Sequence, residues 1–428
     1  MNILILTGKF GMGHWSAAQS LRQQLLGSHP AASVEVVDFP AYAMPNFSGV
    51  LYKFFNLMVT HGRHIFNLYY RITGTGCSDA RPPFEGVFLD RLAQLLYQRQ
   101  ADVVIATHPL CAQLVSRLKE KAREGIQPGA ADGETLDIPL ITCVTDVSSH
   151  PEWINRNTDC YLVPSGEIRR SLTEKGVDPG LVCVTGIPVR EEFRHLSHSS
   201  EGKVRELLIM GGGLGMLPRD TAFYDALNRI PHTHVTVITG CNRRLYQRLR
   251  GRWENIQVEG YISQVWDYMA RADLIVSKPG GITLFEAIYA RVPILTWPPT
   301  LQNERNNAKW MEEQGIGWVA DSMNCAGEIR KILMDRERLS AAAYRMECLR
   351  RRLQTGALDR MMEAVYRSGC HGWKEKISGM DIVGGIDGCD RVCVVSGTVV
   401  GNALGESETG KNPLSVWGTV SDAGVCGL

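Results

Sequence analysis

The chain contains 428 residues, 44% of them hydrophobic, and carries a formal net charge of +1 at pH 7. A chain of this length and apolar content is expected to bury a large core and to divide into two or more domains. The near-zero net charge provides no global field that would recruit nucleic acid, so we expect no nucleic-acid partner. Because no run of about 18 apolar residues occurs, no membrane-spanning helix is expected.

The N-terminus and the cysteines indicate a cytoplasmic protein. Residues 1–8 pass directly from an apolar run into a glycine loop, without the pattern of a signal peptide. The 12 cysteines are scattered without metal-ligand spacing. Cys389 and Cys393 are four apart, but no second pair or histidine cluster accompanies them. We therefore expect reduced thiols and no metal site.

The first half alternates short apolar strands with helices. A strand at Ile3–Leu6 leads into a glycine loop at Gly8–His14 and then a helix at Ser16–Leu26. The loop lacks the G-x-G-x-x-G spacing of a dinucleotide-binding turn and is predicted to face a phosphate or a diol. This alternation predicts an α/β fold with a parallel, doubly wound sheet that binds ligands at the carboxyl ends of its strands. Further strands are predicted at Val34–Asp38, Val103–Ala106, Leu140–Val144 and Tyr161–Val163.

The segment from Pro40 to Cys77 interrupts the alternation. It mixes eight aromatic residues with cations, and no acidic residue occurs between Asp38 and Asp79. This composition suits a segment that lies on an anionic lipid surface. The alternative is a helical excursion packed on its own domain. The candidate membrane contacts are Tyr52, Phe54, Phe55 and Arg63.

The second half repeats the pattern after a polar linker at residues 195–203. Its first strand, Glu206–Met210, is followed by another glycine turn at Gly211–Gly215. We therefore predict two Rossmann-like domains that face each other across a cleft, at residues 1–194 and 204–368. Residues 125–137 are expected to form a surface loop, and the glycine-rich residues 369–428 a poorly ordered tail. The remaining strands are predicted at Val235–Thr239, Ile256–Glu259, Leu274–Val276 and Ile294–Thr296.

The stretch from Asp273 to Ala287 carries the main functional signal. An apolar strand is followed by Pro279, Gly280 and Gly281 and then by a helix at Ile282–Ala290. The unpaired N–H groups and the positive dipole end of this helix suit a phosphate. Glu286, one turn past Thr283, lies on the same helical face and could accept hydrogen bonds from a ribose. The alternative is that the two glycines merely end a strand.

Seven motifs, in the same order as in a known family, extend over residues 1 to about 368. The chain resembles GT-B glycosyltransferases of the MurG and monogalactosyldiacylglycerol synthase family, and most of all the diacylglycerol glycosyltransferases among them. The motifs are Gly11-Met12-Gly13-His14, Thr145-Asp146 with His150 and Trp153, Gly186-Ile187-Pro188-Val189-Arg190, Gly211-Gly212-Gly213, Gly240-Cys241-Asn242, Gly260-Tyr261-Ile262, and Lys278 to Ala287.

The resemblance implies inverting transfer of a hexose from a UDP-sugar, with no cofactor. It places Tyr261 and Ile262 at the uracil and Glu286 at the ribose. Glu304 would bind sugar hydroxyls, whereas Asn303 stands where lipid-transferring members usually carry Gln, which leaves the donor sugar open. The diphosphate would be held by the helix start and by Arg190, because no metal-binding Asp-x-Asp occurs. The other residues expected at the donor site are Gly212, Gly213, Lys278, Gly280, Gly281, Ile282, Thr283 and Asn307.

The reaction also needs a base for the acceptor hydroxyl. His14, which follows Gly13 in a glycine turn, and Asp146, at a strand's carboxyl end, are the two candidates. His150 and Trp153 would line the acceptor site or simply pack. We expect UDP-glucose or UDP-galactose as donor and diacylglycerol as acceptor, at the cytoplasmic face of an anionic membrane. The alternatives are a MurG-like UDP-GlcNAc transferase, a UDP-sugar 2-epimerase and a non-catalytic nucleotide-sugar sensor.

Overall fold

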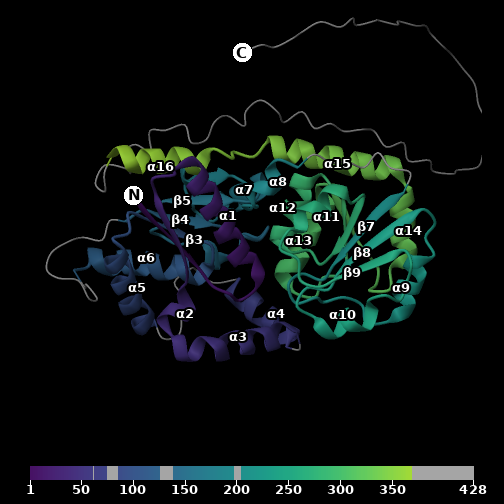
Figure 1. The fold of residues 1–428 in the computed structure, drawn as a ribbon. Coiled ribbons are helices and arrows are strands. Elements are labelled where there is room, and N and C mark those ends of the chain that lie inside the picture. Colours follow the sequence, from purple (N-terminus) through teal and green to yellow (C-terminus); the bar gives the residue numbers. More distant parts are fainter. Residues whose placement is uncertain (61, 75–84, 126–137, 197–203, 369–428) are drawn as a thin grey trace, which may run out of the picture. The chain divides into compact units, whose positions relative to one another are not determined.

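The computed structural model describes residues 1–60, 62–74, 85–125, 138–196 and 204–368. Its strands form two six-stranded parallel sheets, in the orders β2-β1-β3-β4-β5-β6 and β12-β11-β10-β7-β8-β9 (Figure 1). Each sheet is one Rossmann-like half, as the sequence predicts. Each is also doubly wound, because strands are added on both sides of the first strand of its half.

The strands β3 to β6 of the first sheet are fully buried because nearly all of their residues are apolar, whereas the edge strand β2 is partly exposed. Ile3 and Ile5 pack with Leu21 and Leu25 on one face, whereas Leu4 and Leu6 face the other, as the two-residue period of a strand requires. The strands are β1 (Asn2–Thr7), β2 (Ser33–Asp38), β3 (Val103–Ala106), β4 (Leu140–Cys143), β5 (Cys160–Val163) and β6 (Val182–Val184). The helices are α1 (Met12–Ser28), α2 (Phe39–Ala43), α3 (Pro45–Thr60), α4 (Arg63–Thr73), α5 (Glu85–Arg99), α6 (Pro109–Arg123), α7 (Gly166–Glu174) and α8 (Glu191–Arg194).

Side chains of the second sheet also alternate between its two faces. Leu207 and Ile209 face one layer of helices and Leu208 and Met210 the other. Its strands are β7 (Arg205–Met210), β8 (Thr233–Ile238), β9 (Ile256–Glu259), β10 (Leu274–Ser277), β11 (Ile294–Thr296) and β12 (Gly317–Val319). Its helices are α9 (Thr221–Asn228), α10 (Arg243–Leu249), α11 (Val265–Arg271), α12 (Gly281–Ala290), α13 (Gln302–Glu313), α14 (Ala326–Met334) and α15 (Arg336–Arg351).

The last described helix, α16 (Ala357–Ser368), returns to the first half (Figure 1). Its apolar side chains, including Leu358 and Met361, pack in one cluster with Ile3 and Ile5 of β1. The sequence analysis assigned this helix to the second half. The packing corrects that assignment: α16 completes one face of the first sheet, so the second half lies between two parts of the first along the chain.

The predicted strands occur within two residues of their expected ends. Helix α1 begins at Met12 instead of Ser16, which places Gly13 and His14 in its first turn instead of in the preceding loop. The edge strand β12 and the short strand β6 were not predicted. The expected surface loop and linker lie outside the described residues for the most part (126–137 and 197–203). The expected tail at 369–428, with Cys389 and Cys393, lies outside them entirely.

Candidate active site

His14 is held at the carboxyl edge of the first sheet by residues that follow two other strands. Its Nδ1 lies 2.9 Å from the Thr107 carbonyl oxygen and 2.7 Å from the Thr145 hydroxyl. A carbonyl oxygen can only accept, so the proton belongs on Nδ1 and the lone pair on Nε2. This tautomer presents Nε2 as a proton acceptor, which is the state that a general base requires.

Asp146 follows β4 and interacts electrostatically with His14. Burial lowers the pKa of His14, and the opposing effects of the Asp146 charge and of the Thr107 carbonyl do not restore it. Burial raises the pKa of Asp146, and the charge of His14 and hydrogen bonds from Asn307 and Asn303 oppose that rise. The two groups therefore form one coupled pair, in which the imidazole is neutral near pH 7.

A second histidine, His108, belongs to this site and was missed by the sequence analysis. It caps α6 through Nδ1, which accepts from the Leu110 N–H at 3.2 Å. Its ring lies 4.6 Å from the His14 ring in an edge contact, and burial holds its pKa well below the usual value. The sequence does contain a signal for His108, because this residue follows the strand β3 just as Asp146 follows β4, and side chains at these strand ends meet at one edge of the sheet.

Helix α12 brings its N-terminus against this pair. Gly280 is its N-cap and no side chain caps its first N–H groups. A Cβ on Gly281 would lie 2.4 Å from the Thr145 carbonyl oxygen and 2.9 Å from Ile187 Cδ1. The lack of a side chain at Gly281 therefore lets the two halves approach each other, whereas the sequence analysis attributed it to the approach of a ligand. Thr283 and Ile282 lie in the same first turn and are partly exposed.

Asn307 connects the two halves at the same place. This fully buried side chain accepts from the Val147 N–H at 2.8 Å and donates to the Pro279 carbonyl at 2.9 Å. Its Nδ2 also lies 3.3 Å from Asp146 Oδ1. The sequence analysis expected Asn307 to bind the UDP-sugar. In the structure its amide instead fixes the Asp146 loop to the turn before α12.

Further charged and polar groups lie beside Asp146. Lys278 and Glu304 form an ion pair at 3.4 Å, and Glu304 is buried whereas Lys278 is about one-third exposed. Asn303 hydrogen-bonds to Asp146, and its Oδ1 is buried without a partner. A Cβ on Gly212 would lie 3.3 Å from Lys278 Cε, and one on Gly213 would lie 2.9 Å from Met12 Cγ. The predicted sugar-binding residues thus lie next to the candidate base.

Glu286 marks the other end of the predicted donor site. Burial raises its pKa to about 7, against the opposing charge of Arg190. Arg190 donates to the Ser263 carbonyl at 2.8 Å and lies over Trp266. Arg190 therefore contacts the segment that follows Tyr261 and Ile262, the two residues predicted to border the uracil. Tyr261 is exposed and Ile262 is partly buried. Arg190 lies at the nucleoside end of the predicted site, whereas the sequence analysis placed it at the diphosphate.

Two family models match the chain. One, described as monogalactosyldiacylglycerol (MGDG) synthase, matches residues 14–189, and the other, the glycosyltransferase family 28 C-terminal domain, matches residues 207–348. The processive diacylglycerol beta-glucosyltransferase of Staphylococcus carnosus is 26% identical over 374 residues, which cover 84% of this chain and 91% of that protein. The chain is a glycosyltransferase with an MGDG synthase domain followed by a family 28 C-terminal domain.

Solved structures show the same GT-B fold. Acinetobacter baumannii MurG has a TM-score of 0.54 at 16% identity, and the match covers 86% of this chain and 99% of that one. The Anabaena protein HepE in complex with UDP and glucose has a TM-score of 0.50 at 14% identity, and the match covers 86% of this chain and all (100%) of that one. The two facing halves of this glycosyltransferase are therefore those of the GT-B architecture.

The aromatic residues predicted to touch a membrane divide into two groups in this glycosyltransferase. Tyr52 donates to Asp38 and packs on Phe10, and Phe55 also packs on Phe10, at 5.3 Å between ring centroids. Only Phe54 of the three points outward, with 62% of its surface exposed. Arg63 begins α4, and its side chain lies outside the described residues.

His150 and Trp153 pack inside the protein. His150 donates from Nε2 to the Tyr70 carbonyl at 2.9 Å and stacks on the Tyr70 ring, so it holds α4 against the Asp146 loop. Trp153 is buried, and its ring lies 6.2 Å from that of His14. Both side chains therefore pack within the first half, and their expected role in lining an acceptor site stays a prediction. The Gly13 position faces Ile282 across the two halves.

Helices α3 and α4 present a continuous apolar stripe to solvent. The exposed large apolar residues of α3 recur every three or four positions, as one face of a helix does. They are Phe47, Val50, Phe54 and Leu57, and they are joined on α4 by Leu68 and Ile72. Lys53, His64 and Arg71 are exposed on the same helices. No helix among the described residues is both long and apolar enough to cross a bilayer, and none of their His, Cys, Asp and Glu side chains form a metal-binding group.

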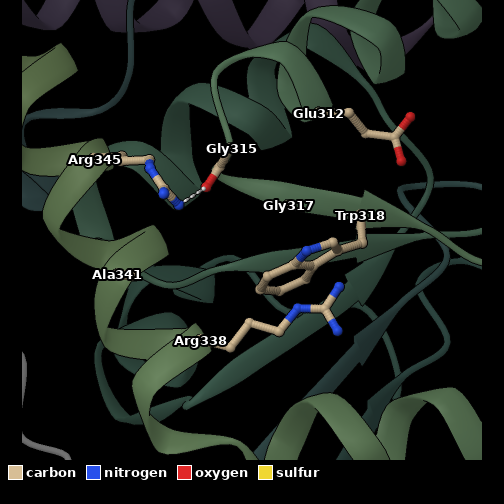
Figure 2. Close-up of a pocket in the computed structure, with 7 residues that line it drawn as sticks. All are labelled: Glu312, Gly315, Gly317, Trp318, Arg338, Ala341 and Arg345. Carbon is tan, nitrogen blue, oxygen red and sulfur yellow. Dashed lines mark hydrogen bonds between the residues drawn. The ribbon is translucent and has the colours of Figure 1, made fainter. Parts of the chain in front are cut away.

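A separate hollow of about 490 Å³ lies in the second half (Figure 2). Figure 2 shows Arg345 donating to the Gly315 carbonyl, at 3.2 Å, and Arg338 lying over the Trp318 ring, at 4.3 Å. The hollow is lined by residues of α13, β12 and α15 and by none of the residues that the sequence predicts for the site. It is therefore a surface feature distinct from the candidate active site.

Proposed function

We propose that this glycosyltransferase transfers glucose from UDP-glucose to the free hydroxyl of diacylglycerol. The observation that carries the proposal is the contact between the uncapped start of α12 and the His14–Asp146 pair. A phosphate at the start of α12 and the proton acceptor His14 would then flank a sugar bound between them. The name of the Staphylococcus carnosus relative supports glucose and diacylglycerol, and the HepE complex supports UDP as the nucleotide.

The donor would lie along α12. Its uracil is proposed to rest against Tyr261 and Ile262, and its ribose hydroxyls to donate to Glu286. The diphosphate would take the free N–H groups at the start of α12, which favour negative charge. Asn303 and Glu304 would then face the glucose. The unpartnered Oδ1 of Asn303 supports this, because a buried acceptor needs a donor such as a sugar hydroxyl.

The proposed reaction is a single displacement. UDP-glucose carries an α-linked sugar, and a β-linked product, as in the relative's name, requires inversion at C1. The acceptor oxygen forms a bond to C1 while the bond from C1 to the UDP oxygen breaks. His14 Nε2 takes the acceptor proton, and the charge of Asp146 stabilises the imidazolium that results. The electron pair of the broken bond leaves with UDP, and the backbone N–H groups at the start of α12 stabilise the negative charge that UDP gains.

The acceptor would come from a membrane on which the first half lies. The apolar stripe of α3 and α4 would enter the headgroup region, while Lys53 and Arg71 attract anionic lipids. Phe54→Asp should therefore weaken binding to anionic vesicles. Tyr97→Asp, which replaces an exposed aromatic residue of α5 outside the stripe, is the matched control. Equal vesicle binding by the two variants would contradict the membrane assignment.

The experiment that tests the function offers purified protein diacylglycerol in vesicles together with labelled UDP-glucose, UDP-galactose or UDP-GlcNAc. We expect label in a lipid product with UDP-glucose. A UDP-GlcNAc preference would favour the MurG-like activity instead. Conversion of a UDP-sugar in the absence of any acceptor would favour an epimerase, and binding of a UDP-sugar without turnover would favour a sensor.

A further inference from the structure

We propose that helix α10 gives the second half its own contact with the anionic bilayer. The inference rests on the proposed function, since it concerns the same membrane. Five arginines lie between residues 243 and 252, and no acidic residue occurs between Asp225 and Glu254. The Pro40–Cys77 segment of the first half has the same cation-rich, acid-free composition. The five are Arg243, Arg244, Arg248, Arg250 and Arg252.

The fold turns these arginines outward. Leu245 and Leu249 are the buried positions of α10 and fix its inner face. Arg243, Arg244 and Arg248 occupy other positions of α10, and all five arginines are exposed. None of the ion pairs formed among the described residues involves any of the five. Their charges are therefore available to an external anion.

The start of α10 lies where the two halves meet. Met12 of α1 packs against Gly213, whose carbonyl oxygen accepts from the Cys241 N–H at 3.0 Å, next to the start of α10. Asn242, the N-cap of α10, donates to the Gly215 carbonyl of the same glycine turn at 3.1 Å. Met12 and Leu214 at this junction are each about half exposed. The arginines thus lie close along the chain to two exposed apolar side chains at the junction of the halves.

A bilayer is the partner that this surface fits best. The patch is one short helix face and a turn that carry several cations, and exposed apolar side chains lie at its edge. That combination suits headgroups of a negatively charged membrane, which attract each nearby cation and admit apolar side chains. Contact through both halves would hold the donor-binding half at the surface from which the acceptor enters.

The test compares two triple variants of the full chain that remove the same three charges. The patch variant is Arg243→Gln, Arg244→Gln, Arg248→Gln, and the control replaces the exposed Arg91, Arg170 and Arg336 of other helices by Gln. Co-sedimentation uses vesicles of phosphatidylcholine alone or with phosphatidylglycerol. We expect the patch variant to bind the anionic vesicles about a hundredfold more weakly than wild type, because each cation near the surface contributes about fivefold.

Three further measurements keep the outcome interpretable. The Arg243→Lys, Arg244→Lys, Arg248→Lys variant should retain binding, and the wild-type affinity should fall with salt more steeply than that of the patch variant. Transfer to a short-chain diacylglycerol dispersed in neutral detergent should be unchanged in the patch variant. Anionic-vesicle binding equal to that of the control would overturn the inference. Absence of transfer by the wild type, with vesicle binding intact, would instead refute the proposed function.

Discussion

Replacing Gly281 by alanine should separate the two halves of the active site. The new Cβ would lie 2.4 Å from the Thr145 carbonyl oxygen, whereas ordinary contacts begin at 3.4 Å, so one backbone must retreat by about 1 Å. The Ile187 side chain, 2.9 Å away, can rotate aside, but the nearest atom belongs to the backbone of Thr145. Thr145 hydrogen-bonds to His14 and precedes Asp146, so this shift would displace both candidate catalytic groups. A displacement of this size at reacting groups costs on the order of 100-fold in rate. We therefore expect kcat/KM for both substrates to fall by about that factor.

The matched control is Gly166→Ala. Gly166 is the first residue of α7, as Gly281 is of α12, and a Cβ there meets nothing within 4 Å. Kinetics with UDP-glucose and diacylglycerol, thermal unfolding and calorimetry with UDP should be measured on both variants. We expect Gly281→Ala to keep most of its UDP affinity, because its backbone N–H remains. Equal kcat/KM in the two variants would refute the argument that this glycine sets the approach of the halves.

Three further predictions concern single side chains. Because burial lowers the pKa of His14, kcat at saturating UDP-sugar should be lost only as pH falls below the ordinary histidine range near 6.5, and His14→Ala should abolish that acid limb of kcat against pH with little effect on UDP affinity. Since the pKa of Glu286 is about 7, calorimetry should show UDP affinity rising from pH 6 to pH 8 as the carboxylate forms, and Glu286→Gln should remove this dependence and weaken binding by about tenfold. Asn307→Ala leaves the Val147 N–H and the Pro279 carbonyl without partners, so the free energy of unfolding in urea should fall by about 3 kcal/mol. An unchanged unfolding midpoint would contradict the role of Asn307 in joining the Asp146 loop to the turn before α12.

The sequence predicts the sheets and the place of the site because both depend on local patterns. Apolar runs such as Leu274–Val276 are strands buried on both faces, and the carboxyl end of a parallel strand is where Asp146 was expected and found. The same rule could have found His108. The error at α1, whose first turn includes His14, arose because a glycine-rich start carries no capping signal.

The remaining features depend on contacts between distant residues, which local patterns do not contain. Asn307 meets Asp146 across 161 positions, and Gly281 meets Thr145 across the two halves. Neither contact could be derived from spacing. The apolar face of α16 predicts that the helix is packed, but nothing in its own sequence selects the first sheet over the second. The same limit applies to Tyr52, because its aromatic ring could contact a membrane or, as in the structure, pack against Phe10.

The return of α16 to the first sheet has a consequence for how the protein can be made. During synthesis, β1 emerges from the ribosome long before Leu358 and Met361, which cover part of its face and follow the whole second half along the chain. Until then one face of the nascent first sheet exposes apolar side chains, which can bind chaperones or cause aggregation. Expressing the first half alone by stopping at the linker would leave that face exposed permanently, so an isolated first half would need α16 joined to its end.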